Sequence, residues 1–375
     1  MTAALALGTA PELLAHPVLA ATVHVADRLL RPHADATAQS GVPRAHLDAL
    51  ARAGTLGLAA HRPAGDGRQG ARLMREAAEV LAAADGATWF VAAQHHQPVR
   101  EVMASDNGEL RERWLGELTS GRTLSGIAVS HLAHPGRPAV TATASRGGGW
   151  LLTGRVPWFT GWGLADVVLL GAATPDDRVL LALLPCATVA SRPGTVRRHD
   201  LWSMSATHAV GIELRAVRVT PAQVVALPSR TDWLRAYTQR TIDTHPAVFG
   251  SLRATTAFLH AHAGGTDTAP GAADGFGQLA IDVARRAAIL RRRAYALCDH
   301  APPGEATRER HTIRAAAVEL AFRSASACLA ATGARSMLRH ATAARLTAEA
   351  AFHLVHGQTS DAANLYAQRL LDGPE

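Results

Sequence analysis

Lysine is absent from the 375-residue chain, so all 38 of its basic residues are arginines. Together with the abundant alanine, this bias is typical of a GC-rich genome rather than of selection for arginine chemistry. Cysteine is also scarce: Cys186, Cys298 and Cys328 are odd in number, widely spaced and outside any CxxC motif. This pattern excludes a disulfide framework and a cysteine-based zinc site, and it predicts a reducing, cytoplasmic location.

Long apolar segments and clustered positive charge are lacking as well. The alanine-rich N-terminus has no basic segment, and Glu12, His16 and Asp27 interrupt it, which argues against a signal peptide or a membrane span. The net charge is +7, but the arginines are interleaved with acids. We therefore expect no nucleic-acid partner; the positive field suits an anionic small ligand or an acidic carrier equally well.

Hydrophobic patterning divides the chain into three regions. Residues 1–118 have helical periodicity, as in ARLMREAAEVLAAAD, where the apolar residues fall on one stripe. Residues 119–228 contain short β-rich runs between Gly, Pro and Asp. Residues 229–375 are helical again, with closely spaced alanines. The predicted fold class is α+β: an N-terminal α-helical domain, a central antiparallel β domain and a C-terminal four-helix-bundle domain.

The segment GWLLTGRVPWFTGWGLADVVLLGA, residues 149–172, combines a strand-like run with closely spaced aromatics. Side chains at i and i+2 share a face of a strand, so Trp158 can cover a planar ring while the Thr160 hydroxyl reaches its rim. An isoalloxazine ring needs this combination of apolar cover and rim hydrogen bonds. Alternatively, Trp158 and Phe159 are core residues of the β domain and Thr160 is an ordinary strand residue.

Five features follow one another along the chain: LDALARAGTLGL with LMREAAEVLAAADGATWFVAAQHH, then LSGIAVSHLAHPG, then residues 149–172, then LWSMSATHAVGIELRAVRV, and finally AATGARSM with HGQTSDAANLYAQRLL. In this order they resemble the acyl-CoA dehydrogenase superfamily over most of the chain. The resemblance implies an FAD-dependent oxidoreductase that acts on an acyl thioester or related small molecule and assembles as a homodimer or homotetramer.

The resemblance also implies specific cofactor contacts. Trp158 and Thr160 would contact the flavin, and Phe159 would contribute its backbone. The other expected contacts are Ile127, Val129 and Ser130 on the pyrimidine side, Thr359 at the last helix, and Gly333 and Arg335 from a neighbouring subunit. For the last three positions, ordinary helix caps and a C-terminal glycine turn are the alternative.

The sequence departs from the family where the catalytic base is expected. Gly357 and Gln358 stand where the family has Glu and Gly. The alternative position of the base, on an earlier helix, falls near Gln239 and Arg240, and Asp243 lies about one helical turn further on. General base catalysis contributes about 10²- to 10⁴-fold, so an ordinary dehydrogenase lacking both carboxylates would be severely impaired.

Histidines are the remaining candidates for a base. His356 is adjacent to the missing glutamate and is our candidate catalytic residue, with a structural role as the alternative. His131 beside the flavin loop and the pair His95 and His96 are weaker candidates. Adjacent histidines point apart and no HExxH pattern is present, so we expect no metal.

Three functions remain open at this point. The first is a two-electron oxidation with a non-standard base, which needs an electron acceptor. The second is a flavin-dependent monooxygenase on the same fold, which uses O2 and reduced flavin from a flavin reductase. The third is a catalytically silent flavin-binding scaffold.

Overall fold

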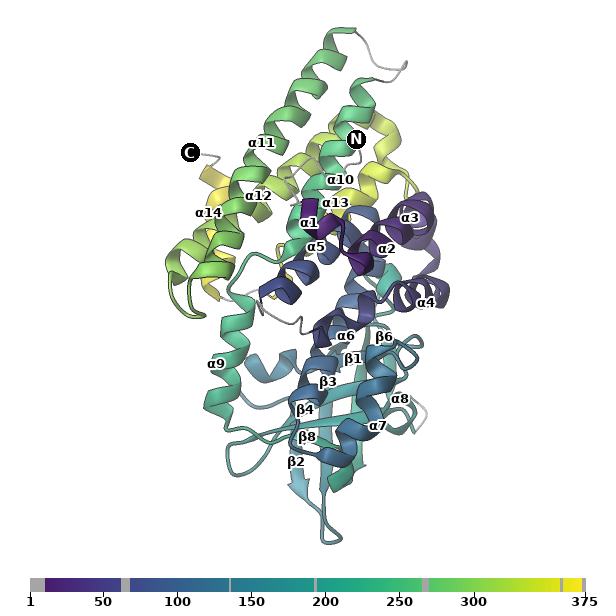
Figure 1. Ribbon diagram of the computed structural model, residues 1–375, viewed down its shortest axis with the longest axis vertical. Helices are drawn as coiled ribbons and strands as arrows, with labels where there is room; N and C mark the ends of the chain where they lie inside the picture. Colours follow the sequence, from purple (N-terminus) through teal and green to yellow (C-terminus); the bar gives the residue numbers. More distant parts are fainter. Residues whose placement is uncertain are drawn as a thin grey trace.

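The computed structural model describes residues 11–61, 68–134, 136–191, 194–264, 270–357 and 360–372. Helices occupy one end of the molecule and a β region occupies the other (Figure 1). The chain changes from helix to strand between Thr119 and Ser125 and returns to helix between Ala226 and Arg230. The predicted fold class is therefore confirmed, and we retain 1–118, 119–228 and 229–375 as the proposed domains.

The N-terminal region is built of helices, as its helical periodicity predicts. They are α1 (Pro11–Leu14), α2 (Pro17–Val25), η2 (Ala26–Leu30), α3 (Arg31–Ser40), α4 (Arg44–Arg52), η3 (Thr55–Ala60), α5 (Arg68–Ala84), α6 (Gly86–Ala104) and α7 (Gly108–Thr119). Helix α4 follows Pro43 and leads into Gly54, whose φ of +76° favours glycine. The apolar stripe of α5 is buried, as its spacing predicts. The carboxylate of Asp85 caps α6.

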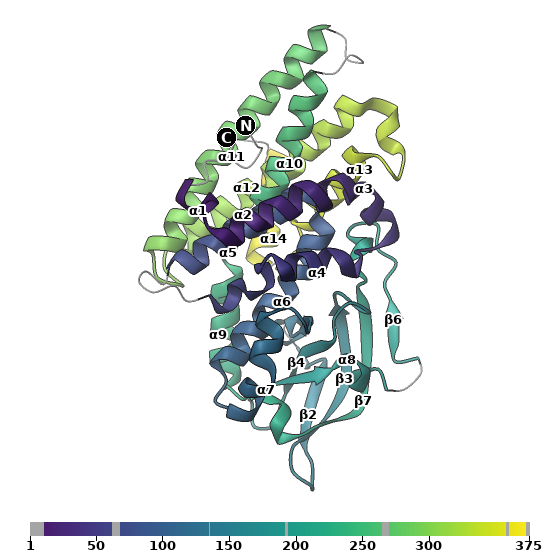
Figure 2. The same cartoon turned by 45° about the vertical axis from the view of Figure 1, so that its right-hand side comes forward.

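The β region is one mixed eight-stranded sheet, with a short helix α8 (Cys186–Val189) after β5. Its strands are β1 (Ser125–Ala128), β2 (Val140–Ala144), β3 (Trp150–Phe159), β4 (Val167–Ala173), β5 (Val179–Pro185), β6 (Val196–Arg198), β7 (Val210–Val219) and β8 (Val224–Ala226). The order is β6-β7-β3-β2-β4-β5-β8, and β1 pairs with β4. Strand β6 is the outer strand beside β7, as Figure 2 shows.

The sheet is not purely antiparallel, which corrects the prediction in one respect. Strand β4 pairs in parallel with β1 over four residues, from Ser125 opposite Val167 to Ala128 opposite Leu170. It also makes a parallel pairing with β2 at Thr141. Both faces of β4 are buried, and its run of small and branched apolar residues fits a strand covered on both sides.

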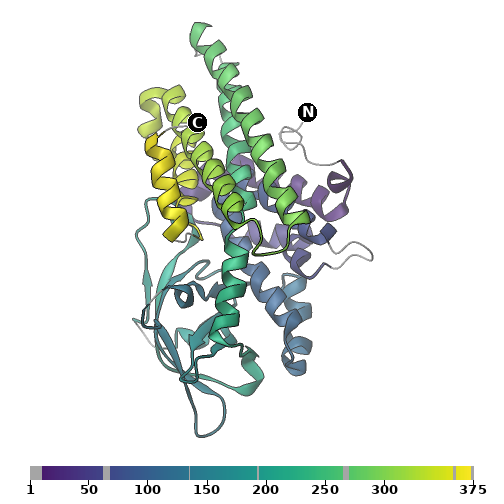
Figure 3. The ribbon, with the colours of Figure 1, turned by 90° about the vertical axis from the view of Figure 1, so that its left-hand side faces the viewer.

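The C-terminal helices form a bundle, and the structure adds a connecting helix to it. They are α9 (Arg230–Thr241), α10 (Pro246–Ala263), α11 (Pro270–His300), α12 (Thr307–Thr332), the 3₁₀ segment η7 (Gly333–Met337), α13 (Thr342–Phe352) and α14 (Ser360–Asp372). Helix α9 runs beside the β region and leads into the bundle, as Figure 3 shows from the side. In the part of the chain that the structure describes, no helix is long and apolar enough to cross a membrane.

A buried charged cluster joins the N-terminal helices to the bundle. Glu79 of α5 is fully buried and accepts a hydrogen bond from Nε of Arg291 in α11 at 2.7 Å. Arg253 of α10 pairs with the same carboxylate. Breaking a buried pair leaves an uncompensated charge, so this cluster restricts how the two helical parts pack against each other.

Candidate functional site

Strand β3 ends in two aromatic residues whose side chains have different environments. Phe159 is 1% exposed and packs in the core of the β region, with Trp162 edge-on to its ring. Trp158 is 52% exposed and lies against the imidazole of His199, with ring centroids 4.1 Å apart. The core interpretation therefore holds for the Phe159 side chain, whereas much of the Trp158 indole is uncovered.

The turn after β3 carries the predicted hydroxyl. Thr160 is half-buried, and its hydroxyl makes no hydrogen bond to the residues that the structure describes. The backbone has φ of +83° at Gly161 and +84° at Gly163, a conformation that favours glycine. The N–H of Gly161 donates to the carbonyl of Thr207 at 2.9 Å, which fixes the turn.

The second predicted cofactor segment is β1 and the 3₁₀ segment η4 (Ser130–Ala133) that follows it. Ile127 and Ser130 are half-buried, whereas Val129 is 1% exposed and packs in the core. A ligand could therefore reach Val129 mainly through its backbone. The Ser130 hydroxyl, like that of Thr160, makes no hydrogen bond to the described residues.

The fold brings these two segments together. A Cβ atom placed on Gly126 would lie 2.7 Å from atoms of the Phe159 ring and 3.2 Å from the carbonyl oxygen of Thr160. Only a glycine at position 126 allows β1 and the end of β3 to approach this closely. We use the name strand-end site for the predicted cofactor residues that follow or end these two strands, Ser130, Trp158 and Thr160.

The other predicted cofactor residues lie apart from the strand-end site. Gly333 and Arg335 are exposed in η7, after α12, and Gly333 has φ of +66°. Their predicted contact with the cofactor of a neighbouring subunit remains a prediction. Thr359 lies outside the described residues.

His356, the candidate base, lies just after α13 among aromatic rings. Its imidazole stacks on Phe352 with centroids 4.9 Å apart and meets Phe90 edge-on at 5.2 Å. The rings of His245 and Trp89 lie 5.2 and 5.9 Å away. Burial lowers the pKa of His356 well below its usual value, and the neighbouring imidazoles and a guanidinium lower it further.

Two more histidines complete this group, which we call the imidazole cluster: His245, His353 and His356. Burial lowers the pKa of His245 to about 4 and that of His353 to about 3. Nδ1 of His245 accepts the backbone N–H of Ala247 at 3.2 Å, so its proton is on Nε2. All three imidazoles are therefore neutral near pH 7.

Burial is the main reason why protonation of the imidazole cluster is unfavourable, and Arg314 adds to it. Its guanidinium donates to the carbonyl oxygens of His356 and Gly357, both at 2.9 Å, and to that of Thr241. The fixed positive charge lowers the pKa of each imidazole in the cluster. An imidazole with a lowered pKa stays neutral but is a weak proton acceptor.

The described carboxylates in this region already have partners. Asp243, the acid closest to the alternative position of the base, pairs with Arg310. Glu349 pairs with Arg345 at 3.0 Å and accepts the N–H of Gly86 at 3.3 Å. Neither therefore supplies the missing base.

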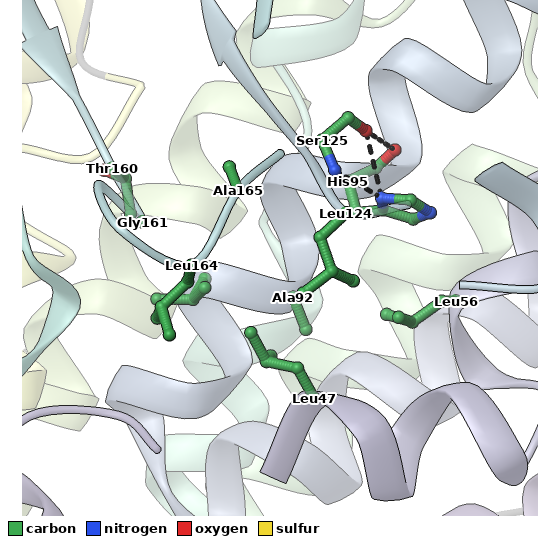
Figure 4. A pocket seen from close by; sticks show the side chains of 11 residues that line it. Leu47, Leu56, Ala92, His95, Leu124, Ser125, Thr160, Gly161, Leu164 and Ala165 are labelled. Atoms are coloured by element: carbon green, nitrogen blue, oxygen red, sulfur yellow. Dashed lines mark hydrogen bonds between the residues drawn. The ribbon is translucent and has the colours of Figure 1, made fainter. Parts of the chain in front are cut away.

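A small hollow, with room for about one water molecule, adjoins Thr160 of the strand-end site (Figure 4). It lies between α4, η3 and α6 on the helical side and the ends of β1 and β3 on the other. Its lining includes the apolar Leu47, Leu56 and Leu164 and the polar His95, Ser125 and Thr160.

Hydrogen bonds fix the state of His95 at this hollow. The backbone N–H of Ser125 donates to Nδ1 at 3.0 Å, and a backbone N–H can only donate, so Nδ1 carries no proton. Nε2 therefore carries it and donates to the carbonyl of Leu118 at 2.9 Å. Burial lowers the pKa of His95 to about 4. With its lone pair occupied, His95 is not a catalytic base.

The other weak candidates are also buried and neutral. Nε2 of His131 donates to the carbonyl of Gly171 at 3.1 Å, and burial lowers the pKa of His131 to about 4. Burial lowers the pKa of His96 to about 3. Among the described residues, no group of three or more His, Cys, Asp or Glu side chains could hold a metal ion.

Sequence reasoning missed the surroundings of His356. Trp89, His245 and Arg314 come from three helices far apart in sequence, so no local pattern signals their proximity. One local signal was available: His245 directly precedes Pro246, and a polar residue before a proline is typical of a helix N-terminus.

Known structures of the same architecture were found over the full length of the chain. Glutaryl-CoA dehydrogenase from Mycobacterium smegmatis in complex with FADH2 is 18% identical, with 100% of this chain and 99% of that chain covered and a TM-score of 0.78. Butyryl-CoA dehydrogenase from Megasphaera elsdenii is 15% identical, with coverages of 97% and 99% and a TM-score of 0.75. The chain has the acyl-CoA dehydrogenase fold.

The same fold also includes an oxygenase. Dibenzothiophene monooxygenase from Paenibacillus sp. A11-2 is 20% identical, with coverages of 95% and 97% and a TM-score of 0.71. That enzyme has also been solved with indole and with FMN bound. No protein-family model and no curated protein matches the chain.

The residues of the strand-end site fit a flavin. The hydroxyls of Ser130 and Thr160, which have no hydrogen-bond partner among the described residues, follow strands β1 and β3, and the uncovered indole of Trp158 precedes Thr160 by two residues. A flavin needs hydrogen bonds at its rim and apolar cover on its face, and these groups are of the required types.

Proposed function

We propose that this chain is an FAD-dependent oxidoreductase whose flavin lies against Trp158. The observation that carries the proposal is the uncovered indole of Trp158 two residues before Thr160, whose hydroxyl, like that of Ser130, has no partner among the described residues. When bound, the flavin supplies the two-electron redox chemistry. The acyl-CoA dehydrogenase fold and the neighbour solved with FADH2 support this assignment.

Trp158 would cover one face of the flavin, and the two hydroxyls would hydrogen-bond its rim. Gly333 and Arg335 of a neighbouring subunit, together with Thr359, would hold the rest of FAD in a homodimer or homotetramer. Titration of purified protein with FAD, followed by flavin absorbance and tryptophan fluorescence, tests the assignment. We expect one FAD per chain and quenched fluorescence; a protein that takes up neither FAD nor FMN would refute it.

The imidazole cluster favours monooxygenation over thioester dehydrogenation. Dehydrogenation of a thioester requires a base for the α-proton. Gly357 stands at the expected position of that base, and burial and nearby charge lower the pKa of the adjacent His356 well below its usual value. The described carboxylates closest to it are paired with arginines. A reaction that uses reduced flavin and O2 does not require that base, and a flavin reductase would then be the partner.

Dehydrogenation of an acyl thioester or related small molecule is the second candidate. It is supported by the position of His356, which is neutral near pH 7 and so has a lone pair available for a proton. In this reaction His356 would take the proton, and the electrons would pass to a separate acceptor.

Two stopped-flow experiments on FAD-loaded protein separate the candidates. Reduced protein is mixed with O2 in one, and oxidised protein is mixed anaerobically with butyryl-CoA or glutaryl-CoA in the other. Monooxygenation predicts rapid reaction with O2 and no bleaching of the flavin by either thioester. Rapid bleaching with slow reaction toward O2 would overturn this choice, and failure of both reactions would favour the silent scaffold.

A further inference from the structure

The turn after β3 is held by a segment of the β region that has an unusual backbone. The 3₁₀ segment η5 (Ser205–Thr207) lies between Met204, with φ of +57°, and His208, with φ of +52°. A left-handed backbone is unfavourable for residues other than glycine, and it persists only where the surrounding structure holds it. The contacts of His208 show what holds it here.

The carbonyl groups at the end of η5 fix the turn that follows Thr160 (Figure 4). The carbonyl oxygen of Thr207 accepts the N–H of Gly161 at 2.9 Å, and that of His208 accepts the N–H of Trp162 at 3.2 Å. The N–H of Gly161 and the carbonyl of Thr160 belong to one planar peptide unit. The first of these hydrogen bonds therefore also fixes the backbone of Thr160.

The imidazole of His208 packs against the helical part of the molecule. A Cβ atom placed on Gly41, in the connection between α3 and α4, would lie 2.6 Å from Cε1 and from Nε2 of His208. The imidazole also hydrogen-bonds the backbone of Val42. Beside this contact, the N–H of Val42 donates to the carbonyl of Ala206 at 3.0 Å. His208 therefore contacts the helical part through its side chain and the turn after β3 through its backbone.

We infer that His208 is a positioning residue, which sets the place of the Thr160 hydroxyl from the connection between α3 and α4. The inference rests on the proposed function, in which that hydroxyl meets the rim of the flavin. A hydrogen bond weakens steeply as its distance and angle change, so the hydroxyl must be held as well as present. His208 acts through Thr160 rather than through a contact of its own with the flavin.

FAD titrations of single and double variants test whether His208 acts through Thr160. His208→Ala removes the imidazole, and FAD affinity should fall about three- to tenfold, as expected when one rim hydrogen bond is lost. Residues that act through one contact are not additive. Combined with Thr160→Val, His208→Ala should therefore bind FAD within about twofold of Thr160→Val alone.

Two further variants separate positioning from general effects on the fold. His208→Asn should bind FAD within about twofold of the wild-type protein, because asparagine tolerates a left-handed backbone and carries a side-chain N–H. Asp177→Ala is the matched control, since Asp177 also has a left-handed backbone, with φ of +55°, but lies in the turn between β4 and β5. Asp177→Ala should leave FAD affinity unchanged.

Hydrogen exchange of the flavin-free protein measures the turn itself. The amides of Gly161 and Trp162 should exchange about tenfold faster or more in His208→Ala, whereas the amides of β4 should keep their rates. If His208→Ala does not fold, Gly41→Ala provides a second route, because its added Cβ displaces the same imidazole. It should produce the same changes in exchange and in FAD affinity.

Several results would overturn the inference. Wild-type FAD affinity in His208→Ala would contradict it, as would a double variant whose loss equals the product of the two single losses. Unchanged exchange at Gly161 and Trp162 would also refute it. A protein that takes up no flavin would refute the proposed function, and the exchange rates would still decide whether His208 holds the turn.

Discussion

The strand-end site and the imidazole cluster are built in opposite ways. At the strand-end site, the hydroxyls of Ser130 and Thr160 have no hydrogen-bond partner among the described residues, and Trp158 is half uncovered. In the imidazole cluster, rings pack against one another and Arg314 disfavours an added proton. One region has groups left for a ligand, whereas the other is arranged to stay neutral.

This difference indicates that the chain has residues suited to binding a flavin but lacks a strong base for proton transfer. A flavin site requires cover and rim hydrogen bonds, and the chain has residues of both types at the strand ends. A dehydrogenase also requires a base of suitable pKa, and here an imidazole beside a guanidinium stands near the position of the carboxylate. The comparison therefore supports a flavoprotein whose reaction does not depend on a strong base.

The largest expected effect is loss of stability in acid, which tests the neutral state of the histidines. Burial lowers the pKa of His245 to about 4 and that of His353 to about 3, whereas an unfolded histidine titrates near 6.5. Above about pH 6.5 both states are neutral and stability is complete. As the pH falls from about 6.5 toward 4, these histidines are protonated in the unfolded chain but not in the folded protein. Each of them then lowers the free energy of unfolding by about 1.4 kcal/mol per pH unit.

Thermal unfolding between about pH 7 and pH 4.5 measures this effect. The Tm should fall steeply with acid in the wild-type protein and less steeply in His353→Gln, each compared with its own value near neutrality. Identical slopes for the two proteins would show that His353 does not titrate as the structure predicts.

The next effect concerns the cover of the flavin. Trp158→Ala should weaken FAD binding about tenfold or more, because it removes both a stacked pair and its apolar area. Trp202→Ala is the control, since Trp202 is 79% exposed and lies outside the strand-end site. Equal FAD affinities for the two variants in fluorescence titrations would remove Trp158 from the site.

A smaller effect is expected from the rim hydroxyl. Thr160→Val keeps the shape of the side chain but loses one hydrogen bond, so FAD affinity should fall about three- to tenfold. Thr153→Val, an exposed threonine of the same strand, should have no effect. A wild-type affinity in Thr160→Val would mean that this hydroxyl does not meet the flavin.

The smallest effect is expected at His356, and this variant tests most directly whether the reaction needs a base. If the reaction needs no base, His356→Gln should change the turnover of reduced, FAD-loaded protein with O2 less than about threefold. Loss of a general base costs about 10²- to 10⁴-fold. A loss of that size would instead identify His356 as catalytic and return the assignment to a base-dependent oxidation.

The sequence predicted the three-part architecture because it depends on local periodicity. The apolar stripe on α5 and the short β runs are both set by residues only a few positions apart. The parallel pairing of β4 with β1 could not be predicted in this way, since it depends on how distant segments return to one sheet.

The candidate site also has one part that local sequence predicts and another part that depends on contacts between distant segments. The segment around Trp158 carries its signal locally, as aromatic, hydroxyl and glycine residues in succession. The environment of His356 does not, because its pKa is lowered by burial and by groups that include His245 and Arg314, the latter 42 positions away in sequence. The contact between Ser125 and His95 likewise joins residues 30 positions apart in the chain.

A crystal structure of the FAD-loaded protein tests the central claim most directly. The account predicts the isoalloxazine ring against the indole of Trp158, with the Thr160 hydroxyl within about 3 Å of its rim, a normal hydrogen-bond distance. A flavin bound elsewhere, with Trp158 still resting only on His199, would contradict it.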